Sequence, residues 1–169
     1  MKLVIHDLAP DTFKGLFLKR PIAGLKIVEN DGTIKTCTGC FDCWIKTPGK
    51  CVLEDSYRHM ATLLSQADEV DIISQCCFGG YSPFVKTVLD RCIGYLLPAF
   101  KVNEGTTRHK LRYDHAFNMT VYFYGSHLSE HEQSLALEMV RANSQSFLPT
   151  QFSVQFFSSP QHMAGEVRL

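Results

Sequence analysis

Residues 70–92, VDIISQCCFGGYSPFVKTVLDRC, contain the pattern that decides the fold. The apolar run at 70–73 predicts a buried strand. Ser82-Pro83 then predicts the start of a helix, because serine caps free N–H groups and proline suits a first turn. The apolar positions of that helix recur at helical spacing and predict one buried face: Phe84, Val85, Val88, Leu89, Cys92, Tyr95 and Leu96. A buried strand that leads straight into an amphipathic helix is typical of an α/β sheet.

The same alternation runs along the rest of the chain. Short apolar runs at 3–5, 25–28, 119–124 and 152–157 predict four more strands. Helices are expected to begin at Pro10, at Asp55-Ser56 and at Ser129, where S-x-x-E forms a capping box. Parallel strands need long crossovers, and helices between the strands supply them. We therefore expect a flavodoxin-like, doubly wound five-stranded parallel sheet with helices on both faces, as a single domain over residues 1–169.

Composition narrows the class of protein. Hydrophobic residues make up 45% of the chain and the formal net charge is zero, which favours a globular protein without a nucleic-acid partner. No apolar run approaches the length of a membrane span, and the first residues, MKLVIHDLAP, lack a signal-peptide core. We therefore expect a cytoplasmic protein with no membrane partner. Residues 98–115 are polar and basic without clear periodicity, and we expect a surface excursion there.

Residues 36–55, TCTGCFDCWIKTPGKCVLED, hold four of the seven cysteines. The spacing is C-x2-C-x2-C-x7-C, at Cys37, Cys40, Cys43 and Cys51. Compact runs of this kind are typical of iron–sulfur loops, because three closely spaced thiolates can reach adjacent corners of one cluster. Structural zinc more often uses two separated pairs. A 4Fe–4S cluster, a zinc ion, and a loop of free or disulfide-bonded thiols are the three open interpretations. The remaining cysteines, Cys76, Cys77 and Cys92, are expected to be small core residues.

Ligands of doubly wound sheets bind at the carboxyl ends of the strands, near the point where the strand order reverses. Four loops are expected at that edge: residues 6–12, the cysteine loop (residues 37–51), residues 76–82 and residues 125–128. The sequence therefore predicts one shared site built from these loops.

Two separated blocks resemble the NADPH-dependent FMN reductase family, and within it the iron–sulfur flavoproteins. The first block is the four-cysteine run followed by Glu54-Asp55. The second is residues 74–82, SQCCFGGYS, with Lys86, Asp90 and Arg91 on the helix that follows. The likeness covers roughly residues 20–125.

This resemblance implies an oxidoreductase in which the cofactor carries the reaction, with no catalytic side chain. FMN would lie across the strand ends, and a cluster at the four cysteines would act as a one-electron port. NAD(P)H or a small electron carrier would supply electrons, and the protein would be a homo-oligomer. The implied contacts to FMN are Thr12, Phe78, Gly79, Gly80, Tyr81, Ser82, Gly125 and His127.

The loop after the first strand departs from the family pattern. Family members hold the FMN phosphate with a Gly/Ser/Arg-rich loop, whereas this chain has HDLAPDT at 6–12. Pro10 lacks an N–H group, and Asp7 and Asp11 repel a phosphate. Riboflavin should therefore bind nearly as well as FMN. The alternative function is a degenerate flavodoxin-like domain without flavin, acting as a metal-binding or protein-interaction module.

Overall fold

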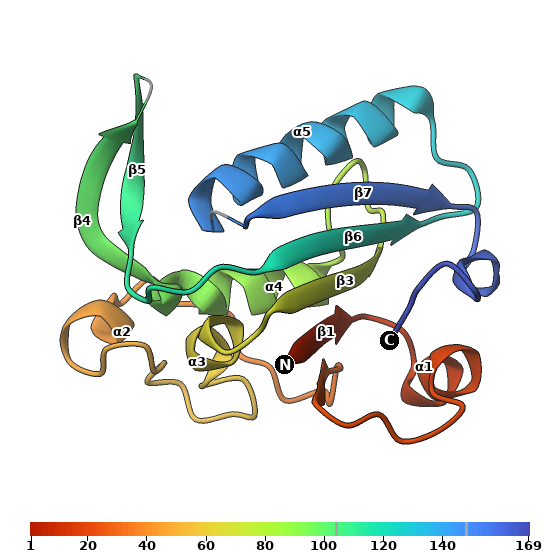
Figure 1. Cartoon of the computed structure of the whole chain (residues 1–169), viewed down its shortest axis with the longest axis horizontal. Helices are drawn as coiled ribbons and strands as arrows, with labels where there is room; N and C mark the ends of the chain where they lie inside the picture. The colour runs from red at the N-terminus through yellow and green to blue at the C-terminus, as the bar shows by residue number, and fades with distance from the viewer. Residues whose placement is uncertain (104, 148) are drawn as a thin grey trace.

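The structure, a computed structural model, describes residues 1–103, 105–147 and 149–169 (Figure 1). Its main sheet has five parallel strands in the order β2-β1-β3-β6-β7. The strands are β1 (Lys2–His6), β2 (Leu25–Val28), β3 (Glu69–Gln75), β6 (Asn118–Tyr124) and β7 (Gln151–Phe157). The order steps away from β1 in both directions, so the topological switch point lies between β1 and β3. The predicted doubly wound parallel sheet is confirmed.

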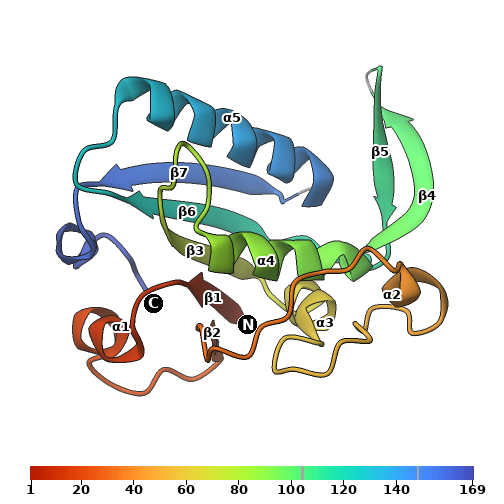
Figure 2. The same cartoon turned by 180° about the vertical axis from the view of Figure 1, so that it is seen from behind.

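Helices cover both faces of this sheet, as the sequence predicts. The α-helices are α1 (Pro10–Phe17), α2 (Asp42–Ile45), α3 (Met60–Ser65), α4 (Pro83–Arg91) and α5 (Glu130–Phe147). Two short 3-10 helices are η1 (Cys92–Tyr95) and η2 (Pro160–Met163). Helices α3, α4 and α5 pack on one face, and Figure 2 shows α4 and α5 in front of the sheet. Helix α1 and the C-terminal segment pack on the other face.

The alternation of side chains along the strands explains why there are two cores. On β1, Leu3 and Ile5 point into the larger core with α3, α4 and α5. Val4 between them points into the smaller core, against Phe13 of α1 and Met163 of η2. Strands buried on both faces read as continuous apolar runs, which is the pattern seen in the sequence.

Residues 98–115 are more ordered than the sequence predicts. They contribute to an antiparallel hairpin of β4 (Leu96–Asn103) and β5 (Thr106–Leu111), which projects beyond the end of α5 (Figure 1). Residue 104 lies outside the described residues. Phe100 and Val102 on β4 are exposed, so burial imposes no clear alternation on this part of the sequence.

Two predicted helix boundaries are wrong. The helix expected at Asp55-Ser56 begins at Met60: the Asp55 carboxylate accepts the Tyr57 N–H at 3.0 Å, but residues 56–59 form turns before α3 starts. Helix α4 ends at Arg91, and the chain continues as η1 into β4, although Tyr95 and Leu96 are buried as expected.

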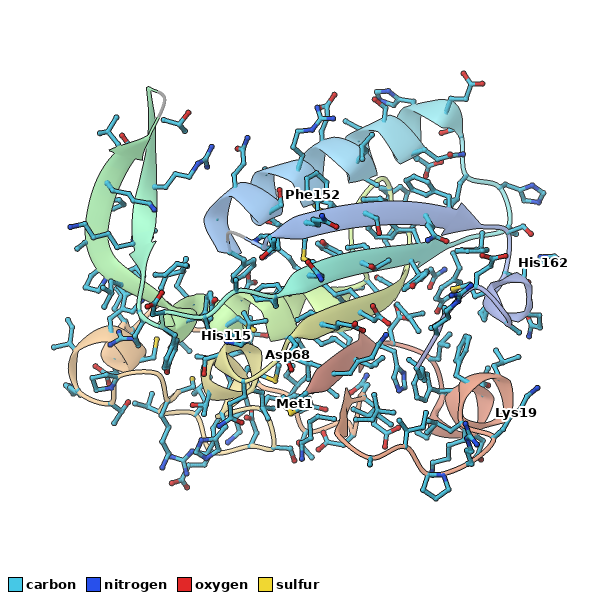
Figure 3. The ribbon with its side chains drawn as sticks, in the orientation of Figure 1. Met1, Lys19, Asp68, His115, Phe152 and His162 are labelled. Carbon is cyan, nitrogen blue, oxygen red and sulfur yellow. The ribbon has the colours of Figure 1, made fainter. Side chains whose placement is uncertain are left out.

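The two ends of the sheet are distinct. Figure 3 shows Met1 and Asp68 together at the end where β1 and β3 begin, and the N-terminal amino group forms an ion pair with Asp68. His162 lies at the opposite end, where the strands finish. None of the helices in the described part of the chain is long and apolar enough to cross a membrane.

Candidate functional site

Three of the four expected loops meet at the carboxyl ends of the strands, and Asp7 connects them. One carboxylate oxygen of Asp7 accepts a hydrogen bond from the backbone N–H of Gln75 at 2.7 Å. The other accepts from the Tyr124 hydroxyl at 3.0 Å. The Asp7 N–H donates to the carbonyl of Ile73 at 3.3 Å. A single side chain therefore spans the switch point and ties the ends of β1, β3 and β6 together.

The turn after β3 presents an aromatic ring to solvent. Cys77 and Gly80 exchange two backbone hydrogen bonds of 2.9 Å, and the residues between them, Phe78 and Gly79, have φ values of 53° and 77°. Positive φ at both central residues defines a type I′ turn. Phe78 is 94% exposed. A bulky side chain in this region costs on the order of 1 kcal/mol or more, and such strain concentrates at functional sites.

Close packing explains why glycine stands at two positions of the carboxyl edge. A Cβ on Gly79 would lie 2.7 Å from the Cβ of Leu135 on α5, and a Cβ on Gly125 would lie 2.8 Å from a Leu128 methyl carbon. A Cβ on Gly80 would lie 3.4 Å from the Cys77 carbonyl oxygen. The absence of side chains at Gly79 and Gly125 lets the loops pack closely against their neighbours. Contact between any of these glycines and a cofactor stays a prediction.

Tyr81 and Ser82 anchor the loop from inside the protein. Tyr81 is 6% exposed and its ring lies 5.3 Å from that of Phe123; burial raises the pKa of its hydroxyl to about 12. Ser82 accepts a hydrogen bond from the Val85 N–H, which caps α4, and donates its own N–H to the Ser74 hydroxyl at 2.9 Å. We assign both residues to positioning the turn that carries Phe78.

The other residues that are predicted to contact FMN differ in how exposed they are. His127 is exposed and, with Gly125, lines a cavity of about 310 Å³ between the loop after β6 and the end of β7. Thr12 is half-buried in the first turn of α1. Cys76 and Cys77 precede the turn; Cys76 is buried and Cys77 half-buried.

The first turn of α1 does not fit a phosphate group. Ala9 at the N-cap has no side-chain oxygen, Pro10 lacks an N–H, and the Phe13 N–H already donates to the Ala9 carbonyl at 3.0 Å. Only the N–H groups of Asp11 and Thr12 remain for an anion, beside the carboxylate of Asp11 itself. A flavin ring at this edge is compatible with the exposed turn, whereas its 5′-phosphate finds few donors.

The cysteine loop lies at the other end of the sheet, so the prediction that it shares an edge with residues 76–82 is wrong. Trp44 of α2 donates its indole N–H to the Ile93 carbonyl at 3.0 Å, and α2 packs against η1 and β4. Figure 1 shows α2 beyond the end where the strands begin. After β2 the chain runs back beside α4, as Figure 2 shows, where Arg91 donates a hydrogen bond to the Lys35 carbonyl at 2.8 Å.

The four thiols of this loop are close to one another without forming a ready metal site. Cys37, Cys43 and Cys51 are half-buried and Cys40 is exposed. Burial raises the pKa of Cys43, and the nearby thiols of Cys51, Cys37 and Cys40 raise it further. Within residues 1–103, 105–147 and 149–169, no three potential ligands are arranged around one point that could hold a metal ion. The cluster therefore stays a prediction.

A buried ion pair, which we call the Asp55–Arg91 clamp, brackets the cysteine loop. The guanidinium of Arg91 donates to both carboxylate oxygens of Asp55, at 2.7 and 2.9 Å, and to the Lys35 carbonyl at 2.8 Å. The two charged side chains are 0% and 1% exposed. The clamp joins the two blocks that carry the family resemblance. The clamp was not predicted from the sequence, although Arg91 stands seven residues after Phe84 on the apolar face of α4.

A second cavity, of about 460 Å³, adjoins the cysteine loop. It lies between α4, α5 and the hairpin, and its walls include Cys37, Phe41, Leu89, Ile93, Met139 and Phe147. Phe41 has a φ of 59° and is half exposed. This groove is far along the fold from the Phe78 turn, because α4 and α5 run between the two ends of the sheet (Figure 2).

No protein-family model matches this sequence, and no curated protein sequence matches it either. Solved structures do match. A NAD(P)H:quinone oxidoreductase from Methanothermobacter marburgensis superposes with a TM-score of 0.55 at 14% identity, covering 95% of this chain and 88% of the other. The fold is flavodoxin-like.

Two further solved structures agree on this fold. An NADPH-quinone reductase from P. pentosaceus has a TM-score of 0.52 at 10% identity, covering 99% of this chain and 98% of its own. An FMN-dependent NADH-azoreductase from Bacillus anthracis, solved in complex with FMN, has a TM-score of 0.50 at 10% identity, covering 92% and 85%. These structural neighbours are flavin-dependent or NAD(P)H-dependent oxidoreductases, and at such identities the likeness establishes the fold alone.

Proposed function

We propose that this protein is a flavin-dependent oxidoreductase that takes electrons from NAD(P)H or a small electron carrier. The observation that carries the proposal is the turn at the carboxyl end of β3. It holds the ring of Phe78 almost fully exposed, next to the switch point where doubly wound sheets bind their ligands. The names of the structural neighbours, azoreductase and quinone reductase, support the same chemistry.

The residues of this edge have distinct tasks in the proposed site. The Phe78 ring offers an apolar face for stacking on a planar ring system. Gly125 and His127 line the cavity between the loop after β6 and the end of β7, which would offer backbone and imidazole groups to a polar edge of the ligand. A bound flavin would supply the hydride and electron chemistry, since it handles one- and two-electron steps.

Titration of riboflavin fluorescence tests the proposal. The wild-type protein should quench the flavin, and Phe78→Ala should weaken binding by about tenfold, in line with the roughly 1–3 kcal/mol measured for aromatic stacking on a planar base. Phe100→Ala is the matched control, because Phe100 is also an exposed aromatic but lies on the distant hairpin. A protein that quenches neither riboflavin nor FMN would support the flavin-free alternative, a metal-binding or protein-interaction module.

We also propose that Cys37, Cys40, Cys43 and Cys51 hold a 4Fe–4S cluster as a one-electron port. The Asp55–Arg91 clamp supports this, because it holds both ends of the loop and keeps the four thiols in one neighbourhood. Under anaerobic reconstitution, Cys40→Ser and Cys51→Ser should lose most iron and sulfide, whereas Cys92→Ser, at a buried position on the α4 side, should lose none. Colourless metal without sulfide would indicate zinc, and no metal uptake would indicate a thiol loop.

The cysteine loop and the Phe78 turn lie at opposite ends of the sheet. We propose a homo-oligomer in which the cysteine loop of one copy lies near the Phe78 turn of another. Light scattering of the purified protein tests this, and a strict monomer would contradict it.

A further inference from the structure

The carboxylate of Asp7 occupies the switch point, where a cofactor's anionic group would otherwise be expected. Both of its oxygens accept hydrogen bonds, from the Gln75 N–H at 2.7 Å and the Tyr124 hydroxyl at 3.0 Å. Burial raises the pKa of Tyr124, and the charge of Asp7 together with this hydrogen bond raises it further. Tyr124 therefore remains a hydroxyl donor throughout the neutral range. The donors that converge on this point already serve an anion of the protein itself.

No cation neutralises this carboxylate in the part of the chain that the structure describes, since none of the ion pairs there involves Asp7. The negative charge of Asp7 affects the pKa of neighbouring side chains. The pKa of Cys77, next to the Phe78 turn, is raised first by burial and then by the charge of Asp7. Asp11 adds a second carboxylate in the first turn of α1. Asp7 and Asp11 thus place two carboxylates beside the first turn of α1, which carries one basic residue, Lys14, further along.

Helix α1 also has few of the free N–H groups that usually bind a phosphate. A helix N-terminus attracts phosphate through its free N–H groups, and Pro10 removes one of them. The Phe13 N–H is used by the Ala9 carbonyl. A phosphate placed here would gain two N–H groups at most and would meet two carboxylates.

We propose that Asp7 is an internal anion that takes the place of a cofactor phosphate, so that the site selects flavin without a 5′-phosphate. This rests on the flavin function proposed above and defines its ligand more closely. The ligand class is a planar isoalloxazine with an uncharged ribityl chain, of which riboflavin is the probe. Asp7 is a specificity-determining residue in this proposal, and it takes no part in electron transfer.

Binding of riboflavin and FMN, followed by quenching of flavin fluorescence, tests the proposal. The wild-type protein should bind riboflavin at least as tightly as FMN in low salt. Asp7→Asn keeps the shape of the side chain and removes its charge, so its affinity for FMN should rise about tenfold while that for riboflavin changes less than about twofold. The control Asp114→Asn removes an exposed carboxylate before β6, at the other end of the sheet, and should change neither affinity.

A salt series on the wild-type protein provides a second measurement that needs no variant. Raising the ionic strength from about 20 to about 500 mM screens the repulsion between Asp7 and the FMN phosphate. The difference in affinity between riboflavin and FMN should therefore become smaller. A wild-type protein that binds FMN more tightly than riboflavin in low salt would overturn the role of Asp7 and leave the flavin function intact. A ratio of FMN affinity to riboflavin affinity that is unchanged in Asp7→Asn and at every salt concentration would also overturn the role of Asp7. Failure of the wild-type protein to bind either flavin would overturn the proposed function and this inference with it.

Discussion

Removal of one partner of the Asp55–Arg91 clamp should destabilise the whole domain. Arg91→Met keeps most of the apolar stem but leaves the Asp55 carboxylate buried without its guanidinium, so two charge-assisted hydrogen bonds of 2.7 and 2.9 Å are lost. Breaking a buried pair in this way costs about 3–5 kcal/mol. That is a large share of the roughly 5–15 kcal/mol that stabilises a typical domain.

Urea unfolding, followed by circular dichroism and by fluorescence of Trp44, measures this cost. Trp44 is the single tryptophan of the chain and lies in the cysteine loop, so its signal also reports on that loop. The double variant Asp55→Leu/Arg91→Met should be more stable than the sum of the two single changes predicts, because neither charge is then left unpaired. The control Lys86→Met removes an exposed pair with Asp90 on the same helix and should cost at most about 0.5 kcal/mol.

The Asp55–Arg91 clamp should also make stability depend on pH. Burial alone would raise the pKa of Asp55, but the hydrogen bonds from Arg91 and from the Lys35 and Tyr57 backbone lower it below its ordinary value. The contribution of the clamp is therefore complete above the ordinary carboxyl pKa and is lost as the pH falls below it. A cost under about 1 kcal/mol for Arg91→Met, or fully additive single changes, would refute the clamp as described.

Two further perturbations test the fold around the site. His6 is fully buried and burial lowers its pKa from 6.5 to about 4, so the folded state should be most stable above pH 6.5 and lose about 3 kcal/mol as the pH falls toward 4. His6→Leu should flatten that part of a stability–pH profile measured by urea unfolding, and a wild-type profile that is already flat would contradict this. Gly79→Ala should cost about 2–4 kcal/mol, because the new Cβ meets Leu135 at 2.7 Å and φ is 77°. Gly32→Ala has a φ of 76° in open space and should cost only about 1 kcal/mol, so equal losses in thermal or urea unfolding would exclude the packing explanation.

The order of strands and helices could be predicted because it depends on local patterns. Each strand of the main sheet is a short segment rich in apolar residues, and the caps at Ser82 and Ser129 are short motifs that act on neighbouring residues. Burial of Tyr95 and Leu96 likewise followed from helical spacing, although the helix itself ends at Arg91.

The position of the cysteine loop could not be predicted in the same way. It depends on the hydrogen bond from Arg91 to the Lys35 carbonyl and on the clamp between Asp55 and Arg91, two residues that are 36 positions apart. Nothing in the local pattern of either residue identifies its partner. The packing of Gly79 against α5 and the hydrogen bonds of Asp7 to β3 and β6 were hidden for the same reason, since these neighbours are distant in sequence.

The proposed function requires a flavin bound at the carboxyl edge of the sheet, beside Phe78. The most direct measurement is the visible absorbance spectrum of the freshly purified, anaerobically prepared protein before and after addition of riboflavin and NADPH, with free flavin removed. We expect flavin bands that remain with the protein and bleach on addition of NADPH, and that are diminished in Phe78→Ala. A visible region that stays blank after incubation with riboflavin would contradict the proposed function.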